Sequence, residues 1–195
     1  MRDEVAVLYT EEQIARRVAE LGAEIGRALA GRELSVLGLM GSLVFMADLI
    51  RHIPLETSMH LVRVSTQREQ TANRVMTEIV FATAVPLEGC DVLLVDDVVD
   101  TGITLSYLLG HLHERRPRSV HVCALIDKPE LRKIDVHPDW AAFSVKEEGG
   151  RFLVGYGLDY NERFAGLPFL GTITPPALGK RPHRVQKRGM GSSRP

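Results

Sequence analysis

The chain has 195 residues and a mass of 21.6 kDa, with 45% hydrophobic and 25% charged residues, which is typical of one globular domain. Its apolar runs are far shorter than the ~20 residues of a membrane span, and its acidic N-terminus does not resemble a signal peptide. The two cysteines, Cys90 and Cys123, lie in apolar runs, which indicates reduced core thiols rather than a disulfide or a metal pair. We therefore expect a cytoplasmic protein.

The net charge of −1 is unevenly distributed. Residues 178–195 contain six cations and no acid, which leaves 18 cations against 25 acids, a net charge of −7, for residues 1–177. An acidic body argues against nucleic-acid binding by the folded domain. We expect one domain over residues 1–177 and a disordered basic tail over 178–195, which either solubilises the chain or makes weak contacts with RNA or acidic partners.

The first predicted element is a helix. Thr10 and Gln13 have the spacing of a capping box, and the apolar residues that follow recur every three or four positions until Gly31. The run from Leu34 to Leu39 predicts a strand, which a tight turn at Gly41 connects to a second helix that extends to Ile50. Ser42 is the candidate cap of that helix.

Further strands and a helix alternate along the chain. We predict strands at 57–64 and 76–83 around a mobile polar loop, buried strands at Asp91–Val95 and Val120–Ile126, and a helix at Thr104–Arg116. This alternation predicts a parallel α/β sheet whose ligand site lies in the loops after Leu39, Val95 and Ile126. Short strands near 140–145, 152–156 and 169–173 indicate a smaller subdomain, with Trp140 and Phe143 in its core.

The segment VLLVDDVVDTGIT, Val92–Thr104, carries the clearest chemistry. Backbone N–H groups at a helix start, a glycine and threonine hydroxyls form a pocket for a phosphate monoester. The adjacent carboxylates of Asp96 and Asp97 suit sugar hydroxyls or a magnesium shell. The segment therefore predicts a ribose 5-phosphate site.

This segment resembles the phosphoribosyl pyrophosphate signature of type I phosphoribosyltransferases. Three further stretches resemble the hypoxanthine-guanine branch of that family, namely Leu37–Ile53, Leu125–Lys133 and Arg151–Ile173. The resemblance extends to about residue 175. It implies the type I phosphoribosyltransferase fold, an α/β fold with a Rossmann-like, mainly parallel twisted sheet flanked by helices. It also implies a small hood subdomain, formed by the N-terminal segment and roughly residues 138–175.

The resemblance also implies roles for individual residues. Asp96 and Asp97 would hold the ribose hydroxyls and magnesium, and Asp100 would be the catalytic general base or acid at the purine N7. The 5-phosphate would lie against the loop made by Asp100, Thr101, Gly102, Ile103 and Thr104.

On the purine side, the resemblance implies that Lys128 donates to the oxygen at purine C6, that Phe152 stacks on the base and that the Leu153 backbone reads the other edge. Asp159 would hold a second Mg²⁺ against the pyrophosphate, and Met40 and Gly41 would form the pyrophosphate loop.

Three positions depart from the family pattern. Met40 replaces a lysine, Ala165 replaces an arginine, and Ser65-Thr66 stands where the closing loop has a Ser-Tyr pair. Two lost charged donors would remove about 3–6 kcal/mol of binding, or about two to four orders of magnitude in rate if all of it reached the barrier. Arg163 and Arg68 are candidates for replacement cations.

The expected function is thus that of a magnesium-dependent purine phosphoribosyltransferase of hypoxanthine or guanine type in purine salvage, active as a homodimer or homotetramer. One alternative is a non-catalytic or weakly active regulator that binds nucleotide or phosphoribosyl pyrophosphate, with RNA binding through the tail as a sub-case. Another is transfer to a different base, such as xanthine. The presence of Asp100 favours a catalytic protein over a regulator, because a protein that only binds its ligand needs no proton-transfer group.

Overall fold

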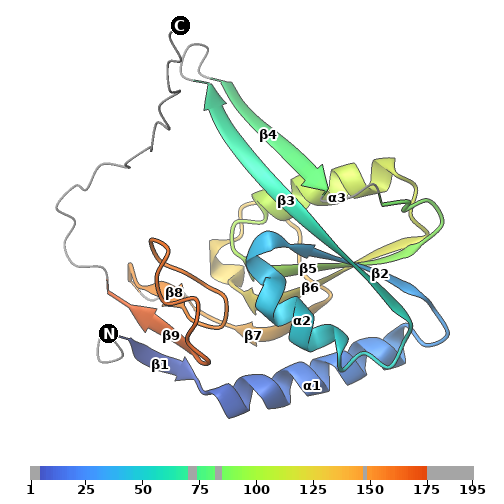
Figure 1. Ribbon diagram of the computed structural model, residues 1–195. Coiled ribbons are helices and arrows are strands. Elements are labelled where there is room, and N and C mark those ends of the chain that lie inside the picture. Colours follow the sequence, from blue (N-terminus) through green and yellow to red (C-terminus); the bar gives the residue numbers. More distant parts are fainter. Residues whose placement is uncertain (1–4, 70–73, 82–84, 147–148, 175–195) are drawn as a thin grey trace, which may run out of the picture.

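The computed structural model describes residues 5–69, 74–81, 85–146 and 149–174, with side chains for 5–64, 85–146 and 149–174 (Figure 1). Its main sheet has six strands in the order β4-β3-β2-β5-β6-β7. Neighbouring strands are parallel except for β4, which is antiparallel to β3. The bounds are β2 Leu34–Leu39, β3 Thr57–Glu69, β4 Arg74–Phe81, β5 Asp91–Val99, β6 Ser119–Asp127 and β7 Trp140–Ser144. The predicted parallel α/β architecture is confirmed.

Helices cover both faces of this sheet. On one face, α1 (Glu11–Ala28) and α2 (Leu43–Ile50) pack against one set of alternating strand residues, which includes Leu93 and Val95. On the other, α3 (Ile103–Glu114) packs against the alternate set, which includes Leu94. The predicted capping box starts α1, because Thr10 Oγ1 accepts from the Gln13 amide and Gln13 Oε1 accepts from the Thr10 amide. Within the described ranges, no helix has the length and apolarity needed to cross a membrane.

A second, smaller antiparallel sheet has the order β1-β9-β8, with β1 Ala6–Tyr9, β9 Leu170–Ile173 and β8 Phe152–Val154. We call these strands and the turns at 155–169 the hood. Val5, Val154 and Ile173 form a small core of its own. Figure 1 shows this sheet beside the end of α1 that follows β1.

The strand at 140–144 is not part of the smaller subdomain, which corrects the prediction for this segment. It is β7, and it pairs in parallel with β6 at the edge of the main sheet. Trp140 and Phe143 therefore pack against the main core, and the Phe143 ring stacks on Tyr9 at 3.9 Å between ring centroids. Among the strands that the structure describes, only β8 and β9, on either side of residues 155–169, join the N-terminal strand in the hood.

The predicted loop around 65–75 is largely strand. β3 and β4 form an antiparallel hairpin whose pairing continues from Val62↔Phe81 to Glu69↔Arg74, and Figure 1 shows it projecting away from the sheet. Hydrogen bonds between the two backbones sustain strands here without an apolar side-chain pattern. Thr66 lies within β3, opposite Thr77. The side chains of Thr66 and Arg68, and the predicted tail at 178–195, lie outside what the structure describes.

Candidate active site

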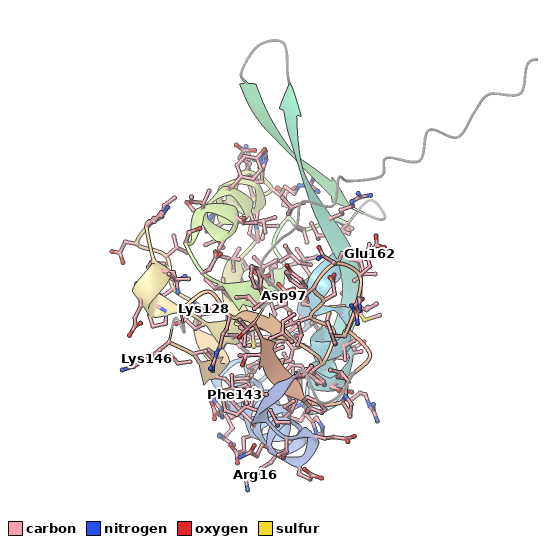
Figure 2. All side chains as sticks on the ribbon, turned by 90° about the vertical axis from the view of Figure 1, so that its left-hand side faces the viewer. Arg16, Asp97, Lys128, Phe143, Lys146 and Glu162 are labelled. Carbon is pink, nitrogen blue, oxygen red and sulfur yellow. The ribbon has the colours of Figure 1, made fainter. Side chains whose placement is uncertain are left out.

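The carboxyl ends of β2, β5 and β6 meet at one edge of the main sheet. Asp96 and Asp97 lie there, but inside β5 rather than after it, because β6 continues to pair with β5 as far as Val99↔Asp127. The strand predicted to end at Val95 is therefore four residues longer. Figure 2 shows Asp97 and Lys128 near the middle of the molecule, between the β3–β4 hairpin and α1.

The two adjacent carboxylates differ in environment. Asp96 is buried, and its Oδ1 accepts from the Asp97 amide at 2.9 Å. Asp97 is half-buried, and its Oδ1 accepts from the Val98 amide at 2.8 Å. Burial, together with the nearby charges of Asp97 and Asp100, raises the pKa of Asp96 well above its usual range. Asp96 is thus a buried acid whose ionised form needs a cation or additional hydrogen-bond donors.

A turn at Asp100–Gly102 connects β5 to α3. Gly102 has φ 80°, a left-handed conformation that glycine adopts without steric cost, and α3 begins at the next residue. The Asp100 side chain is exposed, and its Oδ1 accepts from the Thr101 amide and from Thr101 Oγ1. The amides that open a helix have no acceptor within it, so this turn can receive an anion.

A cavity of ≈ 360 Å³ joins these groups. Asp96, Asp97, Asp100, Gly102 and Thr104 all line it, so the carboxylates and the helix start face one space. The structure therefore brings together most of the residues in which the sequence predicted a ribose 5-phosphate site, whereas Thr101 and Ile103 of the predicted loop are not among the residues that line this cavity.

Arg132 is an additional residue of this region that sequence reasoning missed. Its side chain is 8% exposed, and its two terminal nitrogens donate to the Asp100 carbonyl and to the Asp127 carboxylate. The amides of Lys133 and Ile134 donate to the Thr101 carbonyl at 2.9 and 3.2 Å. Arg132 lies in the stretch that resembles the family, but an arginine in a polar loop usually indicates a solvated side chain. Here it fixes the Asp100 turn.

The first loop is a short 3-10 turn, Met40–Ser42, between β2 and α2. Ser42 occupies the predicted N-cap position of α2, but its side chain makes no capping bond, which corrects that part of the prediction. Its buried hydroxyl donates instead to the carbonyls of Leu39 and Val95, at 2.8 and 2.9 Å. These bonds attach the turn to β5, next to the carboxylates. The Met40 side chain is 53% exposed, so a lysine would fit at this position without disturbing the core.

The predicted purine-binding residues come from two parts of the fold. Lys128 follows β6, is half-buried, and its amide donates to the Val99 carbonyl at 2.9 Å. Phe152 and Leu153 belong to β8 of the hood. The Phe152 ring is exposed on one side and lies 4.8 Å from the Tyr160 ring, measured between centroids.

The predicted second magnesium ligand lies in a hood turn. Asp159 is exposed, and its Oδ2 accepts from the Glu162 amide at 2.8 Å. Ala165 is exposed in the same segment, and the Arg163 guanidinium lies 5.0 Å over the Phe164 ring. Within the described ranges, no group of three or more His, Cys, Asp or Glu side chains could hold a metal by itself.

Comparison with known proteins decides the family. The model of the phosphoribosyl transferase domain matches residues 4–161. The chain belongs to the phosphoribosyltransferase family. The family and the fold expected from the motif at Val92–Thr104 are thereby confirmed.

Several relatives of this phosphoribosyltransferase are named hypoxanthine-guanine phosphoribosyltransferase. Hypoxanthine-guanine phosphoribosyltransferase of Mycobacterium avium is 41% identical, over 87% of this chain and 86% of its own. The enzyme of that name from Bacillus subtilis is 38% identical, over 87% of this chain and 93% of its own. A crystal structure of a hypoxanthine-guanine phosphoribosyltransferase from Bacillus anthracis matches with a TM-score of 0.78 and 35% identity, over 87% of this chain and 98% of that one.

Proposed function

We propose that this phosphoribosyltransferase transfers 5-phosphoribosyl from phosphoribosyl pyrophosphate to hypoxanthine or guanine, giving a nucleoside monophosphate and pyrophosphate in purine salvage. The observation that carries the proposal is the single cavity lined by Asp96, Asp97, Asp100 and the first turn of α3. The relatives named hypoxanthine-guanine phosphoribosyltransferase support the choice of purine.

The geometry supports the roles that the resemblance implies. The 5-phosphate binds at the start of α3, where backbone amides and the positive end of the helix dipole favour an anion. Asp96 and Asp97 accept from the ribose hydroxyls. Asp100 moves a proton at the purine N7, because its exposed carboxylate can turn from Thr101 towards a bound base.

We place the purine next to Lys128, after β6, and Phe152 and Leu153, in β8 of the hood. Lys128 donates to the oxygen at C6, Phe152 stacks on one face of the ring and the Leu153 backbone contacts the opposite edge. The sugar C1 develops oxocarbenium character as pyrophosphate leaves, so the negative charge that builds on the leaving group needs stabilisation.

Magnesium fits the donor set. Mg²⁺ binds through one or two carboxylates and completes its shell with water and substrate phosphates, which suits the adjacent Asp96 and Asp97. The exposed Asp159 would take part in a second such site. When bound, Mg²⁺ supplies positive charge at the pyrophosphate oxygens. Because positions 40 and 165 carry no cation, we expect slower turnover than that of a family member with both.

A direct assay tests the function. The protein, Mg²⁺ and phosphoribosyl pyrophosphate are mixed with hypoxanthine, guanine, xanthine or adenine, and nucleotide formation is followed. We expect turnover with hypoxanthine or guanine, and its loss in Asp100→Asn. The control Glu88→Gln removes an exposed carboxylate just before the amino end of β5 and should leave turnover intact. Tight nucleotide binding without turnover for any base would instead support a regulator.

We extend the proposal to a homodimer or homotetramer located in the cytoplasm. Leu43 and Val44 are exposed apolar residues in adjacent positions at the start of α2, which a second copy would cover. Light scattering tests the oligomeric state. Nucleic-acid contact is expected only through residues 178–195, and deletion of that segment should abolish any salt-dependent RNA binding while turnover persists.

A further inference from the structure

The hood contacts α2 through a hydrogen bond that the proposed chemistry does not use. The Tyr156 hydroxyl donates to Oδ2 of Asp48 at 2.7 Å. Tyr156 lies in the turn that follows β8, is half-buried and packs against the main core. Asp48 lies in the second turn of α2. The bond therefore connects the segment that carries Phe152 to the helix that follows the first loop.

The backbone of this turn is held in an unusual conformation. Gly155, Tyr156 and Gly157 all have positive φ, at 92°, 50° and 97°. A bulky side chain seldom adopts such a φ, and it persists only where the surroundings hold it. The amides of Tyr156 and Gly157 donate to the carbonyls of Leu167 and Ala165, in the turns that precede β9, at 2.8 and 3.0 Å. These bonds fix the backbone that directs the tyrosine ring to α2.

The same turn lies directly against the first loop. A Cβ on Gly157 would lie 3.3 Å from Cβ of Val44 and 3.6 Å from the carbonyl oxygen of Gly41. Gly41 in turn lies against Asp97, where a Cβ would come within 2.3 Å of Oδ2. The hood turn, the first loop and the Asp97 carboxylate therefore lie next to one another.

The Tyr156 hydroxyl is a persistent donor. An ordinary tyrosine hydroxyl is already protonated in neutral solution, and burial and the Asp48 carboxylate raise the pKa of Tyr156 further. A hydrogen bond to a carboxylate is stronger than one between neutral groups. The contact is therefore suited to fix the distance between the two parts of the site.

Resting on the proposed function, we propose that Tyr156 is a positioning residue: through Asp48 it holds the purine side of the site in a fixed place against the turn Met40–Ser42. Binding of a purine to the hood then strengthens binding of phosphoribosyl pyrophosphate at the first loop. The coupling acts in both directions, as linkage requires.

Kinetics of matched variants test this role. Tyr156→Phe keeps the ring and removes the hydroxyl, and Asp48→Ala removes the acceptor. We expect each to raise the KM for phosphoribosyl pyrophosphate about tenfold, with kcat changed by less than about threefold. Asp48→Ala also removes the exposed ion pair between Asp48 and Arg51, at 3.5 Å. The double variant should therefore be no worse than Asp48→Ala alone, because both substitutions remove the bond between Tyr156 and Asp48. Asp48→Asn keeps an oxygen that accepts from Tyr156 and should restore most of the affinity.

The control is Tyr9→Phe, which removes the hydroxyl of another half-buried tyrosine in the hood. It should match the wild type. A Tyr156→Phe variant with unchanged KM, or effects of Tyr156→Phe and Asp48→Ala that add independently, would overturn the positioning role.

Hydrogen exchange supplies a readout that is independent of turnover. Guanosine monophosphate should slow exchange at the amides of residues 40–45 in the wild type, and this protection should be lost in Tyr156→Phe but kept in Tyr9→Phe. Equal protection in all three proteins would overturn the inference. If the wild type forms nucleotide with none of the purines, the proposed function fails. If the wild type forms nucleotide and the Tyr156→Phe variant has the same kinetics, only the positioning role fails.

Discussion

A Cβ on Gly41 would lie 2.3 Å from Oδ2 of Asp97, closer than real Cβ contacts come. The other oxygen of Asp97 accepts from the Val98 amide at 2.8 Å, so the carboxylate cannot move away without losing that bond. Ser42 fixes the opposite side of the turn by its bonds to Leu39 and Val95. Gly41 is therefore required for the first loop and the carboxylate to lie in contact.

Gly41→Ala should displace the Asp97 carboxylate from the cavity. If Asp97 positions the ribose hydroxyls, we expect kcat/KM for phosphoribosyl pyrophosphate to fall about 100-fold, which corresponds to the loss of about one or two hydrogen bonds to a charged group. The loop is close to solvent, so the melting temperature should change little. Steady-state kinetics and thermal unfolding measure the two effects.

Gly110→Ala is the matched control. Gly110 is exposed within α3, and a Cβ there would meet no atom within 4 Å. This substitution should stabilise the fold by about 0.4–1 kcal/mol and leave turnover unchanged. If Gly41→Ala kept the same activity as Gly110→Ala, the place of Asp97 would not matter for catalysis.

The elements that could be predicted from the sequence are those determined by local pattern. Thr10 and Gln13 start α1 by direct contact between near neighbours, and the strand Leu34–Leu39 lies where its apolar run predicts it. The turn that we propose binds the 5-phosphate was predictable for the same reason, since Asp100, Gly102 and Thr104 lie within one short segment. Local chemistry suffices to indicate such features.

What could not be predicted depends on neighbours that are distant in sequence. β7 was placed in the wrong subdomain because a strand's own residues do not show which strand it pairs with. The hairpin at 57–81 relies on backbone hydrogen bonds across strands, which polar sequences form as well as apolar ones. Arg132 was missed because its two acceptors, Asp100 and Asp127, are known only from the fold.

The raised pKa of Asp96 predicts a pH dependence of stability. In the unfolded chain Asp96 titrates near its ordinary value of about 3.9, whereas in the fold burial and the charges of Asp97 and Asp100 make it bind its proton more strongly. Asp96 therefore contributes most to the free energy of unfolding at pH values below its ordinary pKa. This contribution falls as the pH rises towards the raised pKa of the folded state, and it stays constant at higher pH.

Asp96→Asn removes the free-energy cost of ionising a buried carboxyl group. Relative to the wild type, its melting temperature should increase as pH is raised from 4 through the window of the raised pKa. The control Asp135→Asn removes a carboxylate whose side chain is 99% exposed, and it should give a difference that does not depend on pH in this way. A constant difference for Asp96→Asn across the whole range would contradict the burial argument. Thermal unfolding in buffers of matched ionic strength measures both.

Arg132→Lys should reduce turnover by loosening the Asp100 turn. A lysine keeps the charge but cannot donate to the Asp100 carbonyl and the Asp127 carboxylate with the fixed geometry of a guanidinium. We expect kcat to fall by about 10- to 100-fold. Because Asp100 would be misplaced, the pH profile of kcat should also change.

Arg118→Lys is a matched control for that change, since Arg118 also pairs with a buried aspartate, Asp91, but at the amino end of β5. It should lower stability slightly and leave kcat as it is. Equal kcat losses in the two variants would indicate a general structural effect and would argue against a specific hold on Asp100.

Restoring the two missing cations should raise activity. Met40 and Ala165 are both exposed, so Met40→Lys and Ala165→Arg introduce charge without displacing core side chains. Each new donor to pyrophosphate should contribute about 1.5–3 kcal/mol, or roughly 10- to 150-fold in kcat/KM for phosphoribosyl pyrophosphate. Met59→Lys is the control, because Met59 is similarly exposed but lies opposite Val36 within the sheet, away from the carboxyl ends. A gain in Met59→Lys equal to that in Met40→Lys would indicate general electrostatic attraction instead of a contact at the first loop.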